Sequence, residues 1–262
     1  MARYLFAVFM WYNIVTLQSK TRILVYDIET SYTVGTFFGS PYETNIIHVL
    51  REPYILSIAW RWVGEKQTHV KSLPDFKGYK KDKHSDKELV TFFREIMDEA
   101  HIVVGHNSNG FDTKWVYGRF AVHKIPPPSP FASVDTLKVA RSKFKFTSNK
   151  LGDLAKYFGY EGKMETGGKD LWIDCIEHDD PKAWKKMCDY NKQDVVVTEN
   201  IYKHMIPFIT NHPHLGVGEG KERACPNCAS LHLIKRGKAI RAKKIVHQLQ
   251  CVDCKAWTFE KP

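Results

Sequence analysis

The chain has 262 residues, of which 43% are hydrophobic and 26% are charged, as in an ordinary globular protein. Its formal net charge of +10 favours an anionic partner and makes nucleic acid the first candidate, with a solvated basic surface as the alternative. No apolar run is long enough to cross a bilayer, which excludes an integral membrane protein and favours a cytoplasmic one.

The apolar run LFAVFMWYNIV occupies residues 5–15. Eleven residues are too few for a membrane span, and no small-residue cleavage site follows, so we do not expect secretion. An additional strand or helix, or a start codon assigned too far upstream, explains this run. We therefore treat residues 1–19 as an N-terminal extension.

The first strands form a meander. Residues 22–29 are a short β-branched run that is typical of a buried strand ending in polar residues. Two further strands are expected at residues 54–63 and 68–73, joined by a hairpin turn at residues 64–67.

Helices and strands alternate after this meander. Ser85 is expected to cap a helix whose apolar residues recur at spacings of three and four up to Met97. The later elements are a strand at 101–106, a helix at 112–122, a strand at 132–134, and helices at 150–158 and 181–204. This order predicts an α/β domain in which helices flank a mixed sheet.

Four carboxylates stand out against these elements. Asp27 and Glu29 lie two residues apart on a strand and therefore on one face. Asp112 follows the strand at 101–106, and its alternative role is to cap the next helix. Asp194 lies beside three valines, so its burial requires a cation, either a metal ion or a salt-bridge partner. Tyr190 lies one helical turn before it, on the same face.

Together these motifs resemble the DEDD superfamily of 3′→5′ exonucleases, over about residues 20–208. The matching motifs are D-I-E-T at residues 27–30, N-x-x-x-F-D at 107–112 and Y-x-x-x-D at 190–194. Asp189 stands where another branch of the superfamily has histidine, so the chain is similar to the tyrosine branch. That branch includes the exonuclease domain of family B DNA polymerases and stand-alone relatives, many of them from phages.

The resemblance implies a ribonuclease H-like fold and two Mg²⁺ or Mn²⁺ ions that hydrolyse phosphodiester bonds. The implied metal ligands are Asp27, Glu29, Asp112 and Asp194. Tyr190 would orient the attacking water, because a phenol with a pKa near 10 is a poor base at neutral pH. Thr30, Asn107 and Phe111 would line the substrate's 3′ end, with a core position as the alternative for Phe111.

The implied activity is 3′→5′ removal of nucleotides from a single-stranded end of DNA, with RNA as the alternative substrate. Replication or repair proteins are the expected partners, and a phage-encoded protein would act in the host cytoplasm. One alternative is a non-catalytic nucleic-acid-binding or recruitment protein on a nuclease fold. Another is a structure-specific endonuclease or an RNase that uses the same site.

Two C-x-x-C motifs lie near the C-terminus, at Cys225 and Cys228 and at Cys251 and Cys254. This spacing is typical of a zinc ribbon with one structural Zn²⁺, and two disulfides are the alternative. A histidine, His232 or His247, could also replace one cysteine.

The charge is concentrated in this tail. Residues 216–262 contain ten Lys or Arg against four Asp or Glu, which favours phosphate contact over a solvated basic loop. Residues 210–224 are rich in Gly, Pro and charge, which is typical of a linker. The expected domains are the extension at 1–19, the exonuclease domain at 20–209, the linker at 210–223 and the zinc ribbon at 224–262.

Overall fold

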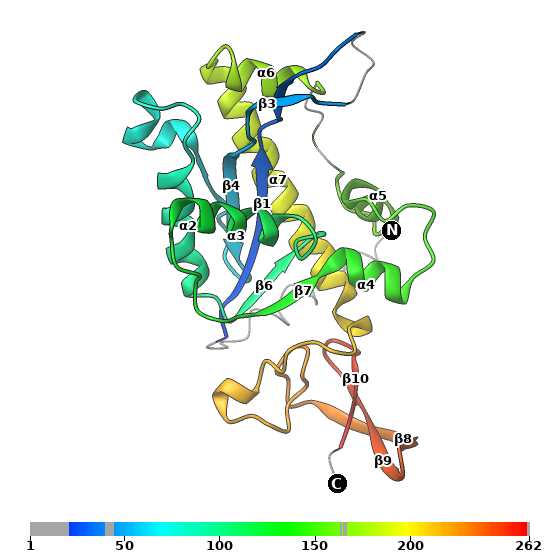
Figure 1. Cartoon of the computed structure of the whole chain (residues 1–262). Helices are drawn as coiled ribbons and strands as arrows, with labels where there is room; N and C mark the ends of the chain where they lie inside the picture. Colours follow the sequence, from blue (N-terminus) through cyan, green and yellow to red (C-terminus); the bar gives the residue numbers. More distant parts are fainter. Residues whose placement is uncertain (1–20, 40–44, 163, 165–166, 261–262) are drawn as a thin grey trace.

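The computed structural model describes residues 21–39, 45–162, 164 and 167–260, so the predicted extension at 1–19 lies outside it. Its centre is a five-stranded sheet in the order β5-β4-β1-β6-β7 (Figure 1). The strands are β1 (Ile23–Thr30), β4 (Ile55–Trp62), β5 (His69–Ser72), β6 (Ile102–Gly105) and β7 (Ala132–Asp135). Strand β1 pairs antiparallel with β4 and parallel with β6, which confirms the mixed sheet.

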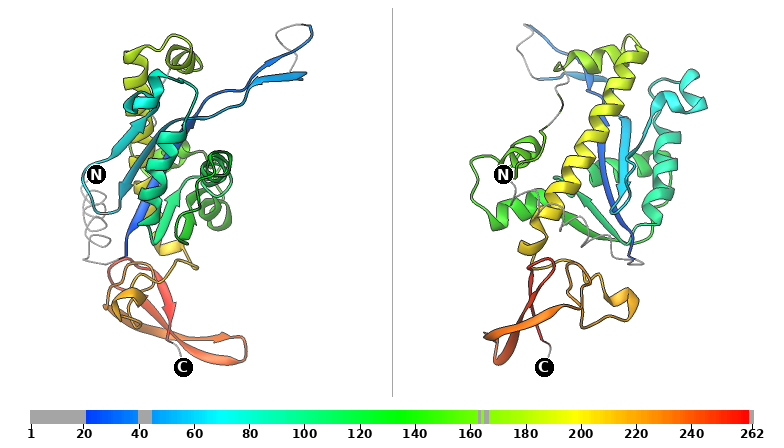
Figure 2. Two further views of the ribbon diagram at one scale, coloured as in Figure 1. Left: turned by 60° about the vertical axis from the view of Figure 1, so that its left-hand side comes forward. Right: turned by 180° about the vertical axis from the view of Figure 1, so that it is seen from behind.

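Helices cover both faces of this sheet. On one face lie α4 (Thr136–Lys143), α5 (Leu151–Tyr157) and α7 (Pro181–Met205); on the other lie α2 (Lys87–Asp98) and α3 (Asp112–His123). Helix α6 (Asp170–Ile176) packs against α7. Figure 2 shows α7 crossing its face of the sheet at an angle to β1. The period-two pattern of β1 therefore sends Val25 toward α7 and Leu24 toward α2 and α3.

The start of α2 corrects one prediction. Its N-cap residue is Asp86 and not Ser85, and neither side chain caps the helix. The Asp86 carboxylate is fully buried instead, where it accepts hydrogen bonds from Ile55 N and from the guanidinium of Arg119. A charged partner on α3 therefore outweighs the local capping interaction.

A two-stranded ribbon, β2 (Val34–Thr36) and β3 (His48–Arg51), was not predicted. It projects from the sheet beyond the end of β1 (Figure 2). Its apolar residues are partly or largely exposed, with Leu50 at 61%. This part of the sequence therefore lacks the alternation of apolar and polar residues that marks a half-buried strand.

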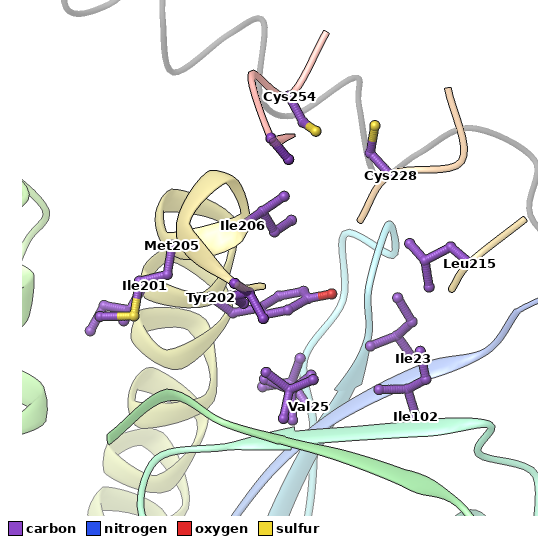
Figure 3. Close-up of a cluster of buried hydrophobic side chains, with 14 of the residues drawn as sticks. Ile23, Val25, Ile102, Ile201, Tyr202, Met205, Ile206, Leu215, Cys228 and Cys254 are labelled. Carbon is purple, nitrogen blue, oxygen red and sulfur yellow. The ribbon is translucent and has the colours of Figure 1, made fainter. Parts of the chain in front are cut away.

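The C-terminal residues form a small antiparallel sheet of β8 (Leu233–Arg241), β9 (Lys244–Cys251) and β10 (Trp257–Phe259). A hydrophobic cluster joins it to the larger sheet (Figure 3). Ile23 and Ile102, at the starts of β1 and β6, share that cluster with Leu215, Cys228 and Cys254. The cysteine module thus packs on the edge where β1 and β6 begin, and the division of the chain at 210–223 stays a prediction.

None of the helices in the described residues is sufficiently long and apolar to span a membrane.

Candidate active site and metal centre

Strand β1 and helix α7 bring three of the predicted carboxylates together. Asp27 and Glu29 follow Val25 on the face of β1 that α7 covers, and Asp194 is buried on α7 with 2% of its surface exposed. Carboxylate oxygens of Asp27, Glu29 and Asp194 all lie within 4.8 Å of one another. Like charges at this spacing repel unless a cation joins them, and an all-oxygen ligand set suits Mg²⁺ or Mn²⁺.

A buried amide holds Asp27 in position. Asn191 Nδ2 donates to Asp27 Oδ2 over 2.8 Å, and Asn191 Oδ1 accepts from Ser57 Oγ of β4 over 3.0 Å. Sequence reasoning missed both partners. Asn191 lies three residues before Asp194, so it shares the face of α7 that meets β1, and this spacing could have identified it. Nothing in the sequence pairs Ser57 with it.

Asp112 lies outside the three-carboxylate group. Its Oδ1 accepts a hydrogen bond from Ile28 N over 3.2 Å. Strand β6 pairs with β1 only as far as Val25, so the Ile28 amide beyond it is open to a side-chain acceptor. The pKa of the Asp112 carboxyl is raised to about 7, mainly because the group is buried. Hydrogen bonds from the backbone oppose this rise, and the negative charge of Asp135 adds to it. A nearby divalent cation would favour the ionised carboxylate.

Asp135, at the end of β7, organises the loop that leads to Asp112. Its Oδ1 accepts from Asn107 N and Leu137 N, each over 3.0 Å, and its Oδ2 accepts from Asn109 N over 3.2 Å. Asn107 has a left-handed φ of 64°. A Cβ atom at Gly110 would lie 2.6 Å from Asn107 Oδ1, so a side chain there would displace the Asn107 amide.

We predict that Asp135→Asn reduces kcat about tenfold. Asp135 accepts from Asn107 N and Asn109 N with two different oxygens, whereas an asparagine side chain has one, so the loop that carries Asp112 is then held less firmly. The partly buried N–H that loses its acceptor also costs about 1 kcal/mol of stability. Steady-state kinetics and thermal unfolding measure the two effects. Asp98→Asn is the matched control, since Asp98 accepts from Ser129 N on the surface. A normal kcat with lower stability would limit Asp135 to a structural role.

Tyr190 lies beside an aromatic residue that sequence reasoning missed. Its ring meets that of Trp172 on α6 edge to face, with centroids 6.3 Å apart and planes at 72°. Trp172 Nε1 donates to Thr30 O over 3.1 Å, which ties α6 to the end of β1. The apolar spacing around Trp172 indicates only a core position, so the sequence offered no sign of this contact.

The three predicted substrate residues line three different hollows. Thr30 lines one of about 790 Å³ with Trp172, and Asn107 lines one of about 980 Å³ beside α4 and α5. Phe111, 40% exposed, lines one of about 470 Å³ with Trp115. The core alternative for Phe111 therefore does not hold, and the three hollows open around the end of the sheet that carries the carboxylates.

The four predicted zinc ligands form a compact buried cluster. Their sulfur atoms lie within 4.8 Å of one another, with Cys225 Sγ 3.5 Å from Cys254 Sγ and Cys228 Sγ 3.7 Å from Cys251 Sγ. A tetrahedral site with Zn–S bonds of about 2.3 Å separates its sulfurs by about 3.8 Å. All four cysteines are free thiols rather than disulfides, and the cluster fits a zinc ribbon. His232 is exposed, and neither it nor His247 joins the cluster.

Both cysteine motifs end in the same turn. The residues after the second cysteines, Ala229 and Lys255, have left-handed φ angles of 58° and 63°. Each donates its N–H to the carbonyl of the first cysteine of its motif. Asn227, inside the first motif, donates from Nδ2 to Ile206 O over 2.7 Å. The cysteine turn thus caps carbonyls at the end of the helix that carries Asp194.

A mixed sheet with carboxylates on its central strand and on the helix that crosses it defines an RNase H-like nuclease fold. In agreement, a comparison with protein families matches residues 51–206 to the RNase_H superfamily. The chain belongs to that superfamily.

Among solved structures, the family B DNA polymerase from the hyperthermophilic archaeon Pyrobaculum calidifontis has a similar fold, with a TM-score of 0.53 and 19% identity. The match covers 71% of this chain and 25% of the polymerase, so the chain spans about a quarter of that protein's length. At this identity the similarity is one of fold alone. A comparison with curated protein sequences gave no significant match.

Proposed function

We propose that the protein is a metal-dependent 3′→5′ exonuclease that shortens single-stranded nucleic acid, DNA rather than RNA. The observation that carries this proposal is the group of Asp27, Glu29 and Asp194, whose oxygens lie within 4.8 Å of one another on an RNase H-like fold. The net charge of +10 supports an anionic polymer as the substrate.

Asp27, Glu29 and Asp194 would hold the divalent ions, and Asp112 would complete the set by turning from the Ile28 amide. The bound ions would polarise the scissile phosphate and lower the pKa of the attacking water. Tyr190 would orient that water through its hydroxyl, and the hydrogen bond from Asn191 Nδ2 would keep Asp27 in position to hold an ion. The cysteine cluster would hold one structural Zn²⁺, because four thiolates leave no open position for substrate.

Gel analysis of 5′-labelled DNA and RNA oligonucleotides, incubated with Mg²⁺ or Mn²⁺, tests this function directly. We expect a ladder of products that shorten from the 3′ end, with DNA degraded faster than RNA. A single internal cut would indicate an endonuclease instead. Binding without any cleavage, under all metal conditions, would indicate a recruitment protein.

Tyr190→Phe is predicted to lower kcat about 10- to 100-fold, because the hydroxyl that orients the water is lost while the ring still packs on Trp172. The Mg²⁺ concentration that produces half of the maximal rise in Tm should stay the same, since the carboxylates remain. Tyr157→Phe is the matched control, because Tyr157 is 49% exposed on α5. An unaltered kcat in the Tyr190 variant would remove its role.

A further inference from the structure

Apart from Asn107, the residues that line the hollow of about 980 Å³ have no role in the chemistry described so far. One wall is the end of β6, and the other walls are α4, α5 and the segment between them. His106 fixes these walls relative to one another. Its Nε2 donates to Asn149 O over 3.0 Å, and its Nδ1 lies 2.9 Å from Thr136 Oγ1 on α4. The hollow is therefore a built groove rather than a gap between loose segments.

The lining of this groove is basic. Arg141, Lys150 and Lys156 are exposed along it, and Asp153 is the one acidic residue among the described lining residues. Asp153 Oδ2 accepts a hydrogen bond from Ser148 Oγ over 2.6 Å. The groove thus carries a net positive charge beside a site that is itself acidic, which suits a chain of phosphates leading away from the metals.

The position of the groove connects the site to the cysteine module. Asn107 stands at the end near the carboxylates, and Lys143 Nζ, at the end of α4, donates to Thr210 Oγ1 over 3.0 Å. In all views, α4, α5 and the β8–β9 hairpin lie on the same side of the molecule (Figures 1 and 2). That hairpin carries the exposed cations Lys238, Arg241 and Lys244.

We infer that this groove binds the sugar-phosphate backbone of the substrate strand on the 5′ side of the scissile bond, and directs it toward the basic hairpin of the cysteine module. The inference rests on the proposed nuclease function and deepens it. On this inference the protein prefers single strands that are long enough to reach from the metal site through the groove. Such a strand occupies both sites at once, whereas a shorter one occupies the metal site alone.

The test combines Arg141→Ala, Lys150→Ala and Lys156→Ala in the full-length protein. We expect the ratio of kcat/KM for a long oligonucleotide to that for a dinucleotide to fall about tenfold or more, since only the long strand reaches all three cations. Binding of a labelled single strand is measured by fluorescence anisotropy, with EDTA present to prevent cleavage. The slope of the logarithm of the binding constant against the logarithm of the salt concentration should become shallower by about 2.

The matched control removes three exposed lysines on the far side of the sheet, with Lys80→Ala, Lys81→Ala and Lys87→Ala. An equal effect in this control would overturn the inference, because the loss of binding would then follow from the lower net charge of the protein and not from the groove. An equal loss on the dinucleotide would also overturn it, since the defect would then lie at the metal site. If the wild-type protein hydrolyses neither substrate, the proposed function fails, and the anisotropy comparison still decides whether the groove binds the strand.

Discussion

Asp194→Asn is expected to lower kcat for hydrolysis about 10³-fold or more and to raise the thermal stability of the metal-free protein. The activity falls because an amide is neutral and has one ligand oxygen in place of two, which makes it a much weaker ligand for a divalent ion than a carboxylate. The stability rises because Asp194 is buried and its carboxylate oxygens lie within 4.8 Å of those of Asp27 and Glu29. Relief of that repulsion is worth roughly 1–3 kcal/mol, or a few degrees in Tm.

Nuclease assays and calorimetry with and without Mg²⁺ separate these two effects. The wild-type protein should gain stability from Mg²⁺, and the Asp194→Asn variant should gain much less. The control is Asp189→Asn on the same helix, because Asp189 is a surface residue paired with Lys185 and Lys192. A metal-free Asp194→Asn protein that is clearly less stable than wild type would show that Asp194 serves structure first, and full activity would end the site assignment.

The local part of this site could be predicted from sequence because it depends on spacing within single elements. Asp27 and Glu29 share a face through the two-residue period of a strand, and Tyr190 and Asp194 share one through the helical turn. The mixed sheet and the helices α2, α3, α5 and α7 followed from the same periodicities, with ends displaced by one or two residues, whereas α4 and α6 were not predicted.

The rest depends on contacts between elements that no spacing reveals. Asn191 reaches Asp27 only because α7 crosses β1 at one particular register, and Asp135 cradles the Asn107 loop only because β6 and β7 are neighbours. The packing of the cysteine module on the sheet was equally hidden. Residues 210–224 have the composition of a linker, yet Leu215 and His212 within them are buried.

That packing gives Cys228→Ser a wider effect than loss of a metal. We expect the bound zinc to fall from about one equivalent to near zero, because a serine hydroxyl is a poor substitute for a thiolate ligand. Cys228 and Cys254 lie in the hydrophobic cluster with Ile206, and Asn227 caps the Ile206 carbonyl. Unfolding of the turn would therefore expose the end of α7 and cost at least about 3 kcal/mol, or roughly 6–12 °C in Tm.

Metal analysis and calorimetry of the full-length protein measure both losses, and a chelator added to the wild type should reproduce them. Cys188→Ser is the control, because Cys188 is only partly buried on α7 and lies outside the cysteine cluster. Two separate transitions in the Cys228 variant, with the larger domain melting as in wild type, would contradict the coupling. A single lowered transition supports it, because the cap on the Asp194 helix and the zinc site would then unfold as one unit.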